Sequence, residues 1–110
     1  MKAFPERGDI IWIDFDPQQG HEQSGTRPAL VISNSKYNQL TKMLIACPIT
    51  SQIKGYSFEI PLTSDLKTFG VVLANQVKTL DWQARGFRFV EHVSDELLEE
   101  VLDTLNAILE

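Results

Sequence analysis

The stretch DIIWIDFD, residues 9–16, alternates apolar and polar side chains in the way that is typical of a half-buried β-strand. Ile11, Ile13 and Phe15 fall on one face, which we expect to lie in the core, and Trp12, Asp14 and Asp16 fall on the other. Further strands are predicted at residues 29–33, 43–49, 57–62, 70–80 and 87–93, and the segment 70–80 is long enough to need a bend or a bulge. This many short strands in 110 residues predict a mainly β fold, a small barrel.

Two helical segments interrupt the strands, a short one at residues 36–40 and a longer one from Asp95 to the C-terminus. Ser94 is a suitable N-cap, and Asp95 and Glu96 suit the positive end of the helix dipole. An apolar stripe on the longer helix is expected to pack on the barrel. Its members are Leu98, Val101, Leu102, Leu105, Ile108 and Leu109. The simplest interpretation of Glu99, Glu100 and Asp103 is a solvated outer face.

Length and composition predict a single domain over residues 1–110, with 43% hydrophobic residues to form its core. The first residues do not resemble a signal peptide, and no apolar run approaches the length of a membrane span. We therefore expect a soluble, cytoplasmic protein with no membrane partner. The single cysteine, Cys47, lies in an apolar run and is expected to be a small buried side chain.

The net charge of -5 argues at first against a nucleic-acid-binding protein. The charge is unevenly distributed, however, because residues 94–110 contain six acidic and no basic side chains. Residues 1–93 then carry ten basic against nine acidic side chains. A phosphate-binding face on that part of the chain is therefore compatible with the composition.

Polar groups concentrate in residues 17–26, PQQGHEQSGT, which are predicted to form a long loop. Loops of this length in a compact domain are usually functional or mobile. Pro28 restricts Arg27 to extended backbone geometry, so the guanidinium is presented from a defined point and suits a phosphate. The alternative is an ordinary surface salt bridge between Arg27 and Glu22.

A second polar group follows the apolar run at residues 43–47. Pro48 is expected to mark an edge or a bulge of the strand, which would direct Thr50 and Ser51 outward, where their hydroxyls could bind a phosphate oxygen. The alternative is that Thr50 and Ser51 only close a turn. With one Cys, two distant His and no glycine-rich phosphate loop, the sequence predicts neither a metal site nor a cofactor.

Several segments together resemble the successive motifs of the MazF/PemK toxins, in the order and spacing of that family. They are GDIIW (8–12), DFDP (14–17), GHEQSGTRPA (20–29), PITS (48–51) and NQVK (75–78). The resemblance implies an SH3-like barrel of the CcdB/MazF/Kid type with a C-terminal helix, forming a homodimer. It also implies sequence-specific, metal-independent cleavage of single-stranded mRNA to a 2',3'-cyclic phosphate and a 5'-hydroxyl, with neutralisation by a cognate antitoxin.

By this resemblance Arg27 and Thr50 match the principal active-site pair of the family, and Glu22 and His21 match loop residues implicated in some members. Attack of a ribose 2'-hydroxyl on its own phosphodiester needs a proton acceptor, a proton donor and a cation. Arg27 is expected to be the cation, because a guanidinium rarely gives up its proton. Glu22 or His21 is then the candidate acid or base, while Thr50 and Ser51 would hold a non-bridging oxygen.

Other polar residues are candidates for binding the rest of the RNA. Asn75 stands where several family members have an acidic residue, which excludes a catalytic carboxylate there and leaves Asn75 as a specificity residue. The full set of predicted RNA-binding residues is Gln23, Ser51, Lys54, Asn75, Gln76, Lys78 and Arg85. The three basic residues of this set are candidate clamps for the RNA backbone, although any one lysine can be merely solvated.

Two other classes of protein fit the same fold. CcdB-like toxins poison gyrase by binding it, and their activity depends on a Trp-Gly-Ile C-terminus, whereas this chain ends NAILE, residues 106–110. A plain SH3-like interaction module would leave the grouping of Arg27, Glu22 and Thr50 without a purpose. RNA cleavage is therefore the preferred prediction, and the gyrase poison is the alternative.

Overall fold

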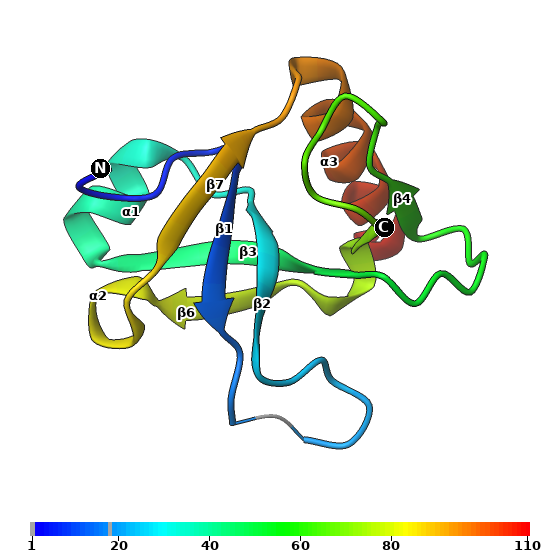
Figure 1. The fold of residues 1–110 in the computed structure, drawn as a ribbon. Coiled ribbons are helices and arrows are strands. Elements are labelled where there is room, and N and C mark those ends of the chain that lie inside the picture. The colour runs from blue at the N-terminus through cyan, green and yellow to red at the C-terminus, as the bar shows by residue number, and fades with distance from the viewer. Residues whose placement is uncertain (1, 18) are drawn as a thin grey trace.

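The chain forms a bent antiparallel sheet with one long helix at its C-terminal end (Figure 1). The computed structural model describes residues 2–17 and 19–110. The elements are β1 (Asp9–Asp14), β2 (Thr26–Val31), α1 (Ser35–Thr41), β3 (Met43–Thr50), β4 (Glu59–Pro61), β5 (Val71–Leu73), η1 (Ala74–Gln76), β6 (Lys78–Asp81), α2 (Trp82–Arg85), β7 (Arg88–His92) and α3 (Asp95–Leu109).

Strand β3 organises the sheet, because three other strands pair with it. The order of the sheet is β4-β5-β3-β2-β1-β7, and β6 pairs with β3 outside this path. The first half of β3 pairs with β6, and its end pairs with β5, where Thr50 lies opposite Val71. Among the described residues β4 and β7 are the two ends of the path, so the barrel remains open. The expected class, mainly β with a C-terminal helix, is confirmed.

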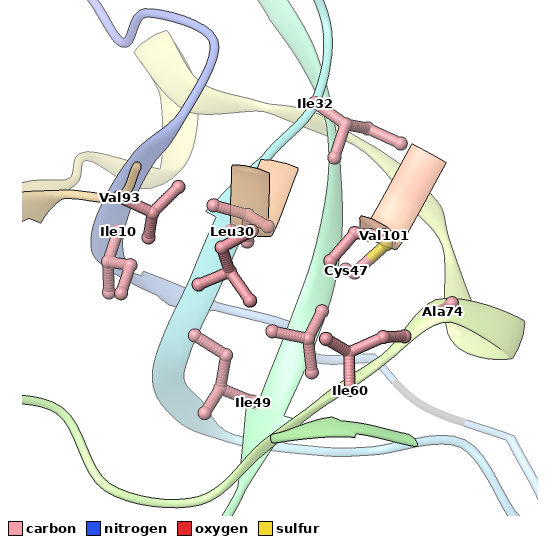
Figure 2. Packing of buried hydrophobic residues seen from close by; sticks show 11 residues of the cluster. Ile10, Leu30, Ile32, Cys47, Ile49, Ile60, Ala74, Val93 and Val101 are labelled. Carbon is pink, nitrogen blue, oxygen red and sulfur yellow. The ribbon is translucent and has the colours of Figure 1, made fainter. Parts of the chain in front are cut away.

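Two apolar cores lie on the two faces of this sheet. One core lies between the sheet and α3 and includes Ile10, Leu30, Ile49 and Val101 (Figure 2). The other contains the predicted inward face of β1, Ile11, Ile13 and Phe15, together with Leu44, Leu80 and Trp82. The start of β1 is therefore buried on both faces, whereas Trp12, further along the strand, is only half-buried.

Helix α3 begins as predicted, with the Ser94 hydroxyl accepting a hydrogen bond of 3.2 Å from the N–H of Leu97. The predicted stripe needs a correction at both ends. Leu97 belongs to the buried set, whereas Ile108 and Leu109 are 48% and 74% exposed. Ile108 and Leu109 continue the apolar stripe of α3. They are exposed because Leu105 is the last residue of the helix that packs on the core. The acidic residues Glu99, Glu100 and Asp103 are exposed, as expected.

The remaining elements follow local signals. The bend expected within residues 70–80 is η1, and the predicted helix at residues 36–40 is α1. Helix α2 was not predicted; the Asp81 carboxylate caps it by accepting from the N–H of Ala84 at 2.8 Å. Cys47 is fully buried as expected, and its burial raises the pKa of the thiol to about 12. In the described part of the chain, every helix is too short or too polar to cross a bilayer.

Candidate functional site

A groove of about 560 Å³ lies where the adjacent ends of β2 and β3 meet the loop between β4 and β5. Its polar lining comes from Gln23, Thr26, Arg27, Thr50, Ser51, Gln52, Lys67 and Thr68, and its apolar lining from Trp12, Pro28, Ile49, Phe69 and Val90. These lining residues include two cations and no carboxylate. The side chains that line the groove thus carry a positive charge although the whole chain is acidic, and they can attract an anion.

The register of β2 and β3 brings Arg27 and Thr50 together in this groove. Ala29 pairs with Pro48 in this antiparallel ladder. Arg27 and Thr50 each lie two residues beyond this pair, toward the same end of the ladder, and both line the groove. The two residues lie 23 positions apart in the sequence, so only the strand pairing makes them neighbours.

The contacts of Arg27 leave most of its guanidinium available. Its Nε donates to the carbonyl oxygen of Ser24 at 3.0 Å. Within the described residues no ion pair joins Arg27 to Glu22, so the surface salt bridge that the sequence left open is absent. With Nε anchored to the backbone, the two terminal nitrogens can hold two oxygens of a phosphate.

Thr50 is 8% exposed, and its hydroxyl oxygen accepts a hydrogen bond of 3.1 Å from the N–H of Gln52. The turn-closing role that the sequence suggested as the alternative is therefore present. It does not consume the hydroxyl, because the proton remains available to donate. Accepting from Gln52 orients the oxygen, so the turn and a phosphate contact are compatible roles for the same side chain.

The two predicted proton-transfer residues lie outside this groove. Glu22 lines a neighbouring pocket of about 160 Å³ with Asn75, Gln76 and Lys78. Its Oε1 accepts from the N–H of Gln19 at 2.9 Å. His21 is exposed. The structure thus brings Arg27, Thr50, Ser51 and Gln23 to one groove, whereas Glu22 and His21 are not among the residues that line it.

A third pocket, of about 100 Å³, joins the first two, because Thr50 also lines it and Gln23 lines all three. Lys54, Asn75 and Gln76 lie in it. The side-chain oxygen of Gln76 accepts from the N–H of Gln23 at 2.8 Å, which ties the β1–β2 loop to η1. The predicted RNA-binding residues around Asn75 therefore form a surface continuous with the groove.

Lys78 and Arg85 donate to backbone carbonyls at the end of β1 and in the β1–β2 loop. Lys78 Nζ lies 3.2 Å from the carbonyl oxygens of both Phe15 and Pro17. One terminal nitrogen of Arg85 lies 2.7 Å from the carbonyl oxygen of Asp14, and it also bonds to that of Asp16. Both cations therefore hold the loop in place in this structure.

Nine residues that line the groove were not among the predicted site residues. Five of them lie outside segments 17–28 and 48–52, namely Trp12, Lys67, Thr68, Phe69 and Val90. Trp12 was assigned only to the outer face of its strand, and residues 63–69 were treated only as a connection between strands. Nothing local distinguishes these residues, since their place depends on which strands pair. In residues 2–17 and 19–110, no three His, Cys, Asp or Glu side chains are grouped so as to hold a metal ion.

Comparisons with known proteins agree with the fold and with the sequence motifs. Residues 6–109 match the model of a family described as PemK-like, MazF-like toxin of type II toxin-antitoxin system. The chain is 44% identical over 105 residues to the endoribonuclease toxin MazF of Escherichia coli K12, which covers 96% of this chain and 94% of that protein. The chain belongs to the PemK/MazF family of toxins.

Solved structures of the family have the same fold. The crystal structure of MazF from Deinococcus radiodurans superimposes with a TM-score of 0.94 and 42% identity, covering 98% of both chains. A MazE–MazF structure from the same organism gives a TM-score of 0.85 at 37% identity and covers 98% of this chain and 97% of that chain. The resemblance predicted from the motifs is confirmed.

Proposed function

We propose that this protein is a toxin that cleaves single-stranded mRNA at specific sequences, leaving a 2',3'-cyclic phosphate and a 5'-hydroxyl. The observation that carries the proposal is the pairing of β2 with β3, which places Arg27 and Thr50 at the same groove. The relative from E. coli named as an endoribonuclease supports this activity. The family assignment also favours RNA cleavage over the gyrase-poisoning alternative.

In the proposed reaction the ribose 2'-oxygen attacks phosphorus, and the bond to the leaving 5'-oxygen breaks. Arg27 stabilises the negative charge that builds on the non-bridging oxygens in the transition state. In metal-dependent nucleases a metal ion has this role. Thr50 and Ser51 donate to a non-bridging oxygen and keep the phosphate aligned. Glu22 or His21 accepts the proton of the 2'-hydroxyl, and the same group or the other of the two gives a proton to the leaving 5'-oxygen. Both transfers require the β1–β2 loop to approach the groove when RNA is bound.

The surface next to the groove supplies candidates for reading the bases. Gln23, Asn75 and Gln76 carry amide groups that can donate and accept at base edges. Lys54 is exposed beside them and suits an RNA phosphate. Lys78 and Arg85 contribute in this proposal by holding the β1–β2 loop, and through it Gln23.

Partners are part of the same proposal. The protein forms a homodimer, acts in the cytoplasm and is neutralised by a cognate antitoxin that covers the RNA groove. The MazE–MazF structures from D. radiodurans support an antitoxin complex. Helix α3, which carries the exposed residues Glu99, Glu100 and Asp103, lies away from the β1–β2 loop (Figure 1), so its charge does not repel RNA at that loop.

The test is cleavage of a long RNA of mixed sequence in the presence of EDTA, with the cut sites mapped by primer extension. Cuts should appear at a defined sequence in single-stranded regions, and duplex RNA should remain intact. The cyclic phosphate is identified by its resistance to phosphatase until acid opens the ring. Activity that appears only after a divalent metal is added would contradict the proposed mechanism.

A further inference from the structure

The loop between β4 and β5, residues 62–70, forms a wall of the groove and carries a large exposed aromatic ring. Lys67, Thr68 and Phe69 all line the groove that contains Arg27. Phe69 is 72% exposed, as exposed as Leu40 on α1, which lies at none of the described pockets. An exposed ring at the border of this groove differs from a scattered surface residue, because the two cations that line the groove can attract an anion.

The C-terminal end of this loop, where it enters β5, passes close to the Thr50 backbone. Gly70 has a φ of +128°, and a Cβ atom built on it would lie 2.2 Å from the carbonyl oxygen of Thr50. Only glycine permits so close an approach at this φ. Phe69 is therefore held directly beside the Thr50–Ser51 segment that we assign to the scissile phosphate.

A carboxylate on β7 holds the other part of the loop. Glu91 accepts from the N–H groups of Lys67 at 3.0 Å and of Thr68 at 2.8 Å, and from the Thr68 hydroxyl at 2.7 Å. Partial burial alone would raise the pKa of Glu91, but these hydrogen bonds and the Lys67 charge outweigh it and lower the pKa. The carboxylate is therefore ionised at neutral pH, and charge-assisted bonds of this kind are stronger than neutral ones.

A β-bulge explains why Glu91 can reach this loop. The pairing of β1 with β7 shifts between Ile10, which faces Glu91, and Ile11, which faces Phe89, so Val90 is the extra residue. Adjacent residues of a regular strand point to opposite faces. Here Val90 lines the groove, and the adjacent Glu91 binds a loop that lines the same groove. The bulge permits this, because it interrupts the regular alternation of side chains along β7.

We propose that Phe69 and Lys67 form a subsite for a nucleotide beside the scissile phosphate, in which the Phe69 ring stacks on an unpaired base and Lys67 binds its phosphate. Glu91 is the positioning residue of this subsite. The proposal rests on the proposed function. A base is the occupant that fits, because single-stranded RNA alternates flat apolar rings with anionic phosphates, and the groove places an exposed ring beside two cations.

The experiment uses an RNA oligonucleotide that contains the mapped cut site, and a series in which one flanking nucleotide at a time is replaced by an abasic ribose. For wild-type protein, one abasic position should raise KM about tenfold, since stacking on an aromatic side chain contributes about this factor. Phe69→Ala should raise KM about tenfold on the intact RNA with kcat unchanged. On the RNA abasic at that position, Phe69→Ala should have no further effect. On the intact RNA, Phe69→Trp should keep the KM close to that of wild type, because it retains an aromatic ring.

Glu91→Gln tests the positioning role, because it retains the size of the side chain but removes the charge that holds the two N–H groups. Glu91→Gln should raise KM several-fold on the intact RNA without changing kcat. The further rise in KM on the abasic RNA should be smaller than for wild type. Leu40→Ala is the matched control, since it removes an equally exposed apolar side chain away from the groove, and its kinetics should equal those of wild type.

Two results would overturn the subsite. In the first, the wild-type protein cuts RNA, but Phe69→Ala raises KM by the same factor on every abasic oligonucleotide. That result would show that the ring contacts no particular base. Conversion of a dimer to monomers by Phe69→Ala, measured by sedimentation equilibrium, would show that the ring belongs to a protein interface. Failure of the wild-type protein to cut any RNA is a separate outcome, which contradicts the proposed function and the subsite with it.

Discussion

The β1–β2 loop and the β4–β5 loop both border the groove, but the body of the protein holds them by opposite chemistry. Carbonyl oxygens of the first loop accept hydrogen bonds from the cations Lys78 and Arg85. N–H groups of the second loop donate to the carboxylate of Glu91. In both cases a charged side chain from a later strand or helix orders a polar backbone segment, so a charge distant in sequence decides the shape of the site.

The largest effect is expected where the first loop enters β2. Arg27→Lys retains the charge but loses the planar fork that can hold two phosphate oxygens, so the cleavage rate should fall by roughly two to three powers of ten. RNA binding should survive, because the positive charge remains. Single-turnover cleavage measures the rate, and fluorescence anisotropy with an uncleavable RNA measures the binding.

Variants of the β1–β2 loop separate this role from proton transfer. Glu22→Gln removes the ionisable group, so if Glu22 is the base the acidic limb of the pH–rate profile should flatten as the rate falls about a hundredfold. His21→Asn tests the other candidate, and the same limb should flatten in that variant if His21 is the base. If the profile persists in both variants while Arg27→Lys abolishes it, then Arg27 itself takes part in proton transfer and our assignment is wrong.

The glycines of the two loops should respond differently to the same substitution. Gly70→Ala forces a Cβ against the Thr50 carbonyl and should cost about 3 kcal/mol in the free energy of unfolding. Gly20 in the first loop has a φ of +60°, but nothing lies within 4 Å of an added Cβ atom. Gly20→Ala should therefore lower the free energy of unfolding by only about 1 kcal/mol. Urea denaturation measures both values. Equal losses would mean that the close approach at Thr50 does not constrain the second loop.

The smallest effect is expected from loosening the first loop through its cationic anchor. Arg85→Gln removes the charge that bridges the carbonyls of Asp14 and Asp16, so amide hydrogen exchange in residues 15–25 should quicken and cleavage should fall about tenfold. Lys36→Gln removes the same charge from an exposed position on α1 and should change neither. Arg85 would instead be an RNA clamp if the exchange were unchanged while the log–log salt slope fell by about one unit.

Much of the candidate site could be predicted because its residues are grouped in the sequence. The polar run at residues 17–26 and the Thr50–Ser51 pair each carry a local signal, and both proved to lie at connected pockets. The wall formed by Lys67, Thr68 and Phe69 carried no such signal. Their contact with the groove depends on the pairing of β3 with β5 and on the reach of Glu91, which are long-range features.

The fold shows the same division. The start of α3, the inward face of β1 and the bend within residues 70–80 were predicted, because capping and side-chain periodicity are local. The predicted end of the buried stripe on α3 was wrong, because the sequence of the helix does not indicate how far the core beneath it extends. Helix α2 was missed, because four residues are too short for a periodic pattern.

The sequence by itself determined the family, the alternation of strands and the chemistry of the first loop, since each depends on residues close together along the chain. Tertiary structure decided the geometry by which Arg27 and Thr50 line one groove, that Glu22 lies in a separate pocket, and that a bulge at Val90 frees Glu91 to hold the second loop. These outcomes depend on strand register, and a shift of one residue in register would turn the side chains to opposite faces.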